Sequence, residues 1–406
     1  MIRHLVLLLT LLGGIVCGCG RSRQSVVETD SMSLAEQNDK PAVADVTAKT
    51  IMTADSLLET LTLRQRISQC FIPSITTSAD SITMRQLREY ISDLNVGGVL
   101  LFNGDLVSAA AIGEACASAD VPLFCAIDAE WGLGMRLIDA PDFPRNGRLG
   151  PRADEDVLYD YGREVARECR RVGINMVLGP VIDVVDNPSG VIGSRSFGQD
   201  PVRVADLGVA YARGLESGNV ISVAKHFPGH GSMTGDTHRE MQVIHRSLHQ
   251  LDSVDLYPFK SYIDAGLSGI MVGHLAVPAI DPENRPAAVS DVVIKDLLRE
   301  ELGFGGLVLT DAFNMGGARG YDASAALTAG ADIIIAPVDT RAEIERVLRK
   351  VKNGEMDSSV IDDKCRRILF YKVLSGLFEM RSRPNPDGIR EDIAAGADSL
   401  YRRLIL

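Results

Sequence analysis

Short apolar runs alternate with amphipathic stretches from about residue 65 onward. The apolar runs, rich in β-branched residues, predict strands at Ser68–Pro73, Gly97–Phe102, Leu123–Asp128, Asn175–Asp183, Ser222–Phe227, Gly269–His274, Leu307–Asp311 and Ile333–Ala336. The stretches between them predict helices at Met84–Leu94, Ser108–Ser118, Glu155–Val172, Val202–Glu216, Asp291–Leu302 and Arg341–Lys352. This alternation indicates parallel βαβ units, and eight strands favour an α/β fold of the (β/α)8 TIM-barrel type. A doubly wound open sheet is the alternative, but such sheets usually have fewer strands.

Titratable residues stand at the C-terminal ends of five of these predicted strands. They are Asp128, Asp183, Lys225 with His226, His274 and Asp311. In a barrel the C-terminal strand ends converge on one face, where active sites are built. If each residue were only a cap or a turn residue, five coincidences would be needed. The pattern therefore favours a barrel with its chemistry at one end.

The first residues predict an export signal. Arg3 and His4 precede an apolar run, Leu5 to Val16, which is too short to span a bilayer and matches the core of a signal peptide. The run ends in Val16-Cys17-Gly18-Cys19, which resembles a bacterial lipoprotein cleavage box with Cys19 as the lipidated residue and Cys17 as a second candidate. A plain cleaved signal or a buried helix is the alternative.

We therefore expect four segments. Residues 1–18 form a lipoprotein signal peptide, and residues 19–50, which are polar and free of aromatic side chains, form a flexible tether. Residues 51–380 form a single catalytic domain, and residues 381–406 form a Pro-rich linker and a trailing helix. This organisation predicts an exported protein, a periplasmic or outer-membrane lipoprotein that contacts the membrane only through a lipid anchor.

Composition narrows the possible partners. The chain has 42 basic and 54 acidic residues, a net charge of −12, and its lack of a basic run argues against nucleic acid. There is no phosphate-cradling loop, and Gly132-Leu133-Gly134 is too little for a dinucleotide fingerprint, so we expect no cofactor. Beyond the signal, the cysteines are widely spaced in apolar segments; we expect core packing, although export would permit one disulfide. They are Cys70, Cys116, Cys125, Cys169 and Cys365.

The segment Lys225-His226-Phe227-Pro228-Gly229-His230-Gly231-Ser232-Met233-Thr234-Gly235-Asp236-Thr237-His238 places three histidines, a lysine and a carboxylate in a loop after an apolar strand. Asp236 can orient and charge the imidazole of His238, which a histidine acid/base requires. A metal site built from the histidines and Asp236 is the competing interpretation. The segment resembles the signature K-H-F-P-G-H-G-x4-D-[ST]-H of the β-N-acetylglucosaminidase branch of family 3 glycoside hydrolases, and every specified position matches.

Further motifs resemble the same family. Ile127-Asp128-Ala129-Glu130 with Arg136 resembles I-D-x-E-G-G-x-x-x-R, although Trp131 replaces the first paired glycine and could stack on a sugar or pack against the barrel rim. Arg195-Ser196-Phe197-Gly198-Gln199-Asp200-Pro201 resembles R-S-F-G-x-D-P, and Leu307 to Met315 resembles the nucleophile motif around Asp311. Asp311 could instead cap the next helix. The resemblance implies Asp311 as nucleophile, His238 with Asp236 as acid/base, and five sugar-binding residues: Asp128, Arg136, Arg195, Lys225 and His226.

Two-domain β-glucosidases of this family take an acid/base glutamate from a second domain, whose opening helix residues 389–400 resemble. We expect either a single-domain version or a shortened form of a longer chain, with the acid/base supplied by the barrel. The resemblance implies a retaining exo-glycosidase, without metal or cofactor, that releases terminal β-linked N-acetylglucosamine through a glycosyl-Asp311 intermediate. An envelope location adds peptidoglycan fragments or imported glycans as substrates. A phosphorylase, a β-glucosidase and a non-catalytic glycan-binding lipoprotein are the alternatives.

Overall fold

The computed structural model describes residues 43–186, 188–233, 241–379, 384 and 386–405. The predicted signal peptide with Cys19, most of the tether, and the predicted dyad of Asp236 and His238 lie outside the described residues. The chain divides into two units, residues 1–45 and 46–406, and the fold below is that of the second unit. No helix within the described ranges has the length and hydropathy that a membrane span needs.

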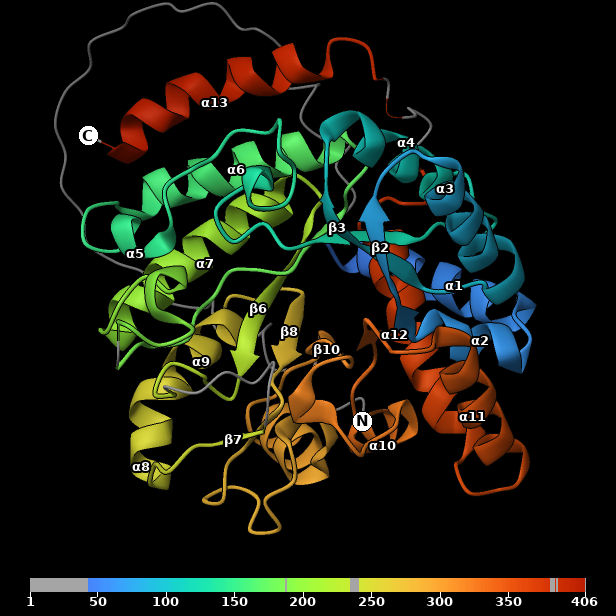
Figure 1. The fold of residues 1–406 in the computed structure, drawn as a ribbon. Coiled ribbons are helices and arrows are strands. Elements are labelled where there is room, and N and C mark those ends of the chain that lie inside the picture. The colour runs from blue at the N-terminus through green and yellow to red at the C-terminus, as the bar shows by residue number, and fades with distance from the viewer. Residues whose placement is uncertain (1–42, 187, 234–240, 380–383, 385, 406) are drawn as a thin grey trace, which may run out of the picture. The chain divides into compact units, whose positions relative to one another are not determined.

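Parallel strands form the centre of this unit (Figure 1). One sheet has the order β10-β8-β6-β5-β4-β3-β2, and β1 pairs with β11. The strands are β1 (Phe71–Ile72), β2 (Ser74–Thr77), β3 (Gly98–Gly104), β4 (Phe124–Ile127), β5 (Met176–Val177), β6 (Ile221–Phe227), β8 (Gly269–Val272), β10 (Leu307–Thr310) and β11 (Ile334–Ile335). Each of the eight predicted strands overlaps one of these strands; most observed strands are shorter than predicted, β3 and β6 are one residue longer, and β2 was not predicted.

Hydrogen bonds join the two edges of the sheet. The N–H of Thr310, at the end of β10, donates to the carbonyl of Ile333 beside β11 at 3.0 Å. On the other side of β11, Ala336 donates to Ile72 of β1 at 2.9 Å, and only Pro73 separates β1 from β2. The parallel sheet and its helices therefore fit the predicted TIM-like barrel, and they disagree with an open sheet, whose outer strands would lack partners.

Helices follow the strands and pack outside them (Figure 1). Most begin at a side-chain cap; Asp105 and Asp154, for example, accept from the N–H groups of Ser108 and Val157. The main helices are α2 (Leu63–Gln69), α3 (Ser81–Arg88), η1 (Glu89–Leu94), α4 (Leu106–Ala117), α6 (Glu155–Arg171), α7 (Pro201–Ser217), α9 (Tyr257–Asp264), η6 (Val292–Glu301), α10 (Ala323–Ala329), α11 (Thr340–Lys352) and α12 (Ser358–Leu374). The strand predicted from Ser68 begins at Phe71 instead, because a capping box at Thr62 starts α2.

Short helices and strands lie within the loops that follow the C-terminal ends of the barrel strands. They are η2 (Leu133–Met135), α5 (Asn146–Leu149), η3 (Gly193–Arg195), β7 (Gln242–Val243), α8 (Leu248–Gln250), η4 (Leu251–Asp255), β9 (Leu275–Ala276), η5 (Ala287–Val289) and η7 (Gly316–Ala318). The predicted strand Asn175–Asp183 is regular only over β5. It loses a ladder donor at Pro180, which has no N–H.

The two ends of the described chain are helical. Helix α1 (Val43–Thr60) overlaps the predicted tether, so residues 43–50 are helical rather than flexible, and Ala54 and Leu58 pack against Cys365 of α12. Helix α13 (Ile389–Ile405) lies over α6 and buries Ile393 and Leu400. The trailing helix is thus present and contributes to the hydrophobic core.

The five cysteines predicted to pack in the core are all buried, and none of them forms a disulfide bond.

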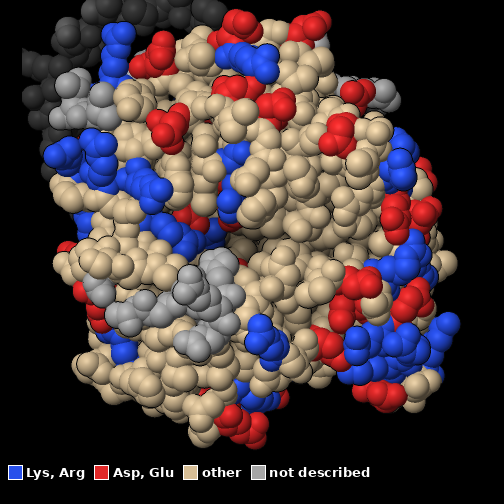
Figure 2. Space-filling model, in the orientation of Figure 1, with Lys and Arg blue, Asp and Glu red and all other residues tan. Residues whose placement is uncertain are grey.

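Acidic and basic side chains are interspersed on the face shown in Figure 2. Among the described residues many charged side chains pair, as Arg171 does with Asp392 of α13 at 3.0 Å and Arg403 of α13 does with Asp160 at 2.7 Å.

Candidate active site

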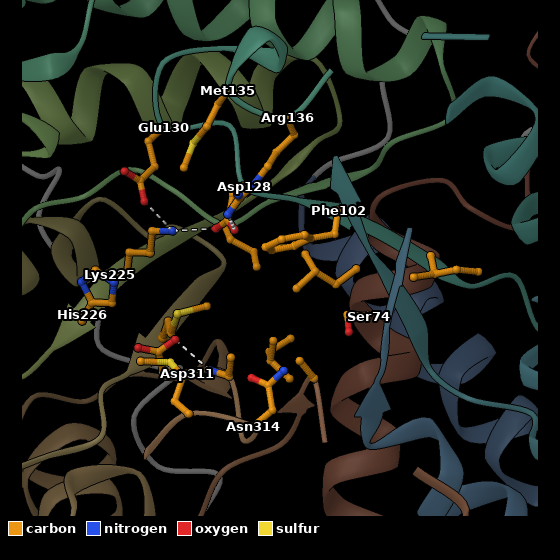
Figure 3. A pocket seen from close by; sticks show the side chains of 18 of the residues that line it. Ser74, Phe102, Asp128, Glu130, Met135, Arg136, Lys225, His226, Asp311 and Asn314 are labelled. Atoms are coloured by element: carbon orange, nitrogen blue, oxygen red, sulfur yellow. Dashed lines mark hydrogen bonds and ion pairs between the residues drawn. The ribbon is translucent and has the colours of Figure 1, made fainter. Parts of the chain in front are cut away.

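A cavity of about 690 Å³ opens at the C-terminal ends of the strands (Figure 3). Its lining includes every predicted sugar-binding residue and the predicted nucleophile: Asp128, Arg136, Arg195, Lys225, His226 and Asp311. They come from the ends of β4, β6 and β10 and from the loops after β4 and β5. The sequence interpretation that these residues converge on one face is therefore confirmed in geometry.

Lys225 lies at the centre of a buried ion-pair network. Its Nζ is 2.8 Å from Asp128 Oδ1 and 2.8 Å from Glu130 Oε1, and its side chain is only 3% exposed. Burial opposes the charge on Lys225, but the two carboxylates outweigh it and raise its pKa. Asp128 also accepts from Arg136 Nη2 at 2.5 Å. Burial opposes the ionisation of Asp128, yet Lys225 and Arg136 hold its pKa below the usual value.

Glu130 and Arg195 form a two-pronged pair next to this lysine. Arg195 Nε and Nη2 donate to Glu130 Oε2 and Oε1 at 2.9 and 2.7 Å, the fork geometry that guanidinium and carboxylate groups favour. Burial works against the charge of Glu130, but Lys225 and Arg195 lower its pKa. These interactions fix the donors and acceptors of the cluster before any ligand arrives, which reduces the ordering cost of binding.

His226 is oriented from behind by Asp183. The ring Nδ1 is 2.7 Å from Asp183 Oδ2, and the backbone N–H groups of His226 and His230 donate to Asp183 Oδ1 at 3.1 and 2.7 Å. Burial disfavours the carboxylate, but His226 lowers the pKa of Asp183, which therefore acts as an acceptor. The proton of His226 consequently sits on Nδ1, and Nε2 faces the cavity, 3.4 Å from Arg195 Nη2.

Lys225 and His226 are adjacent in sequence, yet both line the cavity. A regular strand would send neighbouring side chains to opposite faces. The register between β6 and β8 shifts between Ala224 and Phe227, and such irregularities re-aim side chains near active sites. The strand end therefore presents two polar groups to the same space.

Asp311 follows β10 and faces Asp128 across the cavity (Figure 3). Its Oδ1 accepts from the N–H of Ala312 at 2.7 Å. Burial raises the cost of its charge, but His226, His274 and the Ala312 amide together hold the pKa of Asp311 below its usual range. The sequence also allowed Asp311 to cap the next helix, but the hydrogen bond from Ala312 is the one such contact observed among the described residues. An ionised carboxylate with an open side toward the cavity has the properties of a nucleophile.

His274 supports Asp311 rather than lining the cavity. Its Nε2 is 3.1 Å from the backbone carbonyl of Asp311, and its ring meets Phe313 edge-on at 5.3 Å. Burial lowers the pKa of His274, so a neutral ring donates to this carbonyl. His274, predicted to stand at a strand end, therefore orients a neighbour and is not among the described residues that line the cavity.

Sequence reasoning missed the role of three residues. The sequence motif that contains Glu130 assigns it no function, the pattern marks Asp183 only as a strand-end residue, and it marks His230 only as one histidine of a possible metal site. The signal for Glu130 was its spacing of two from Asp128, which points both carboxylates toward one lysine. The contacts of Asp183 join residues 43 and 47 positions apart, so no local pattern could reveal them.

Trp131, the departure from the family pattern, packs at the rim. Its ring lies under the guanidinium of Arg145 at 4.4 Å, and Arg145 donates to Ser194 at 3.2 Å. Trp131 is not among the described residues that line the cavity. Of the two interpretations left open, packing is therefore the one that the described structure supports.

The dyad of Asp236 and His238 falls outside the described residues. The residues just before the dyad are described. His230 is buried, and the carbonyl of Gly231 accepts a hydrogen bond from the backbone N–H of Asp186 at 3.0 Å. The alternative interpretation, a metal site, also needs Asp236 and His238, so it stays a hypothesis. Within the described ranges, no group of three or more His, Cys, Asp or Glu residues is arranged to hold a metal.

Comparisons with known proteins agree with this site. Residues 62–370 match the model of the glycosyl hydrolase family 3 N-terminal domain. A β-hexosaminidase of Nitrosomonas eutropha is 37% identical over 264 residues, which cover 61% of this chain and 75% of that protein. A family 3 β-N-acetylglucosaminidase structure from Paenibacillus sp. has a TM-score of 0.75 and 30% identity, covering 85% of this chain and 68% of that one.

A β-glucoside phosphorylase, BglX, bound to 2FGlc superposes with a TM-score of 0.81 at 22% identity, over 88% of this chain and 66% of that chain. At that identity the likeness concerns the fold alone. The matched domain spans most of the chain, contains all the described site residues and agrees with the named relatives. The chain therefore belongs to family 3 of the glycoside hydrolases and is a glycoside hydrolase.

Proposed function

We propose that this enzyme is a retaining exo-β-N-acetylglucosaminidase with Asp311 as nucleophile and His238, paired with Asp236, as acid/base. The observation that carries the proposal is an ionised Asp311 across the cavity from a buried cluster of oriented donors and acceptors. The names of the β-hexosaminidase and β-N-acetylglucosaminidase relatives support the choice of sugar.

The proposed reaction has two steps. Asp128, Lys225, Arg136 and Arg195 hold the hydroxyl and acetamido groups of the terminal sugar, with its anomeric carbon toward Asp311. The Asp311 carboxylate attacks that carbon while His238 gives its proton to the leaving oxygen, forming a glycosyl ester. His238 then takes a proton from water, which attacks the same carbon and restores Asp311. Two inversions give net retention.

The charge balance favours water over phosphate as the second reactant. Lys225, Arg136 and Arg195 each contact Asp128 or Glu130, so each cation of the described cluster already has a carboxylate partner. Phosphate would have to displace these partners or find a cation beyond the described lining. A phosphorylase remains the second candidate because a histidine acid/base does not repel phosphate.

The experiment is a panel of aryl β-glycosides, assayed with and without phosphate. We expect faster turnover of the N-acetylglucosaminide than of the glucoside, and free N-acetylglucosamine as the product in both buffers. A sugar 1-phosphate product would support the phosphorylase, and preference for the glucoside would support a β-glucosidase. If no glycoside were turned over, the result would support a non-catalytic glycan-binding protein.

The acid/base assignment has its own test. We expect His238→Ala to slow hydrolysis of a natural disaccharide by about 100-fold or more, because the alkoxide leaving group needs a proton. A dinitrophenyl glycoside leaves without one, so its cleavage should be slowed far less. Equal losses on both substrates would contradict the role of His238.

We also propose that the enzyme is exported and anchored through Cys19, close to peptidoglycan fragments and imported glycans. The support is the signal-like pattern of residues 1–19. Incorporation of labelled palmitate into the protein, and its loss in Cys19→Ala but not in Cys17→Ala, would be the expected result.

A further inference from the structure

The cavity has two chemically different halves. Its charged residues and histidines gather at the ends of β4, β6 and β10 and in the loops after β4, β5 and β6. Among them, Lys225 and Glu130 are buried. The remaining polar lining comes from β2, α3 and the loop after β10. It consists of uncharged side chains: Ser74, Thr76, Gln86 and Asn314. Phe102, at the end of β3, stands between the two halves (Figure 3).

Exposure increases from the charged half to the uncharged half. Lys225 is 3% exposed, whereas Phe102 is 42% exposed, and Thr76, Gln86 and Asn314 are also exposed. An exo-acting enzyme holds the terminal sugar at the closed end of its pocket and lets the rest of the substrate extend toward solvent. The open, uncharged half is therefore the side from which the leaving group departs.

Phe102 is held in a fixed position at this opening. The Arg136 guanidinium lies 4.3 Å from the centre of its ring, and the same guanidinium is tied to Asp128. The backbone fixes the pair as well, because Gly104 donates to the carbonyl of Arg136 at 3.0 Å and accepts from Ile138 at 2.9 Å. Unlike exposed rings elsewhere on the surface, such as Tyr159, Phe102 lines the cavity, so its ring can contact a ligand that enters there.

We propose that Phe102 is the stacking platform of a leaving-group subsite that selects an uncharged second sugar. A pyranose presents an apolar C–H face to an aromatic ring and its hydroxyls to neutral donors and acceptors, which Ser74, Thr76, Gln86 and Asn314 supply. Arg136, the lining cation that contacts Phe102, is already paired with Asp128 and is therefore a poor partner for a second carboxylate. This inference rests on the proposed function and names the substrate class for it.

The test compares three substrates of the purified protein. The first is the β-1,4-linked disaccharide of N-acetylglucosamine, and the second has N-acetylmuramic acid, which carries a carboxylate, as its second sugar. The third is N-acetyl-β-glucosaminyl fluoride, which has no second sugar at all. We expect the wild-type protein to have a higher kcat/KM on the uncharged disaccharide than on the anionic one.

Phe102→Ala should lower kcat/KM on the uncharged disaccharide about tenfold, the upper range for an aromatic contact, and leave turnover of the fluoride unchanged. Phe102→Trp should restore the disaccharide rate. Tyr159→Ala is the matched control, because Tyr159 is also a partly exposed ring beside an arginine, Arg163, but lies on the outer helix α6. It should change none of the three rates.

Several results would overturn the inference. An equal loss on the fluoride would place Phe102 in the terminal-sugar subsite, and an unchanged disaccharide rate would remove it from binding. Wild-type preference for the anionic disaccharide would refute the selection of uncharged sugars. Failure of the proposed function looks different, because the wild-type protein would then turn over neither the fluoride nor the disaccharides.

Discussion

Asp183 holds His226 at two points, accepting from its backbone N–H at 3.1 Å and bonding its ring Nδ1 at 2.7 Å. This double contact determines which ring nitrogen faces the cavity. A residue buried behind the site thereby sets the hydrogen-bonding character of a group that lines the cavity.

We predict that Asp183→Asn lowers kcat/KM on an aryl N-acetylglucosaminide by about 10- to 100-fold, because the loss of a hydrogen bond to a charged carboxylate costs about 1.5–3 kcal/mol. The amide can no longer impose the Nδ1 proton, so the pH profile should change as well as the rate. An unchanged pH profile together with an unchanged rate would show that the Asp183 contact is only structural.

Glu130 anchors two cations, and its removal should affect stability as well as activity. Glu130→Gln leaves the buried Lys225 and Arg195 short of a negative partner, and breaking such a buried pair costs about 3–5 kcal/mol. We expect a lower midpoint in urea unfolding and a higher KM. Glu355→Gln, an exposed substitution near α12, is the control and should change neither quantity. Wild-type stability for Glu130→Gln would contradict the network's structural role.

Asp255, fully buried, introduces a pH dependence of stability. Burial raises the pKa of Asp255 to about 7, and Asp183 and Asp186 add to this effect, while Arg246, 3.1 Å away, opposes it. The folded state thus binds a proton that an unfolded chain, with an ordinary aspartate pKa, has already released. Its contribution to stability is present at low pH and is lost as the pH rises toward 7.

We therefore predict that Asp255→Asn stabilises the protein more at pH 8 than at pH 5, by about 1 kcal/mol or more once the charge is absent. Urea unfolding of both proteins at the two pH values measures this difference. A stabilisation that is the same at both values would mean that Asp255 does not titrate in this range.

The sequence predicted the architecture well because parallel strands buried on both faces give nearly continuous apolar runs, as in Leu307–Thr310, which Asp311 follows. It also placed the site, since strand ends in a barrel converge. It could not assign the orientation of His226 or the paired roles of Glu130, because these depend on contacts between distant segments. The sequence also did not predict that helix α1 begins at Val43. Residues 43–50 carry no strong apolar stripe, so their pattern differs little from that of the polar segment before them.

The central claim, that Asp311 becomes covalently glycosylated, is best tested by mass spectrometry of the intact protein and its peptides after reaction with a fluorinated N-acetylglucosaminide that forms the intermediate quickly and releases it slowly. We predict a mass increase of one sugar residue, located on the peptide that contains Asp311 and absent in Asp311→Asn, which should also lack measurable turnover. An adduct on another residue, or full activity in Asp311→Asn, would contradict the account.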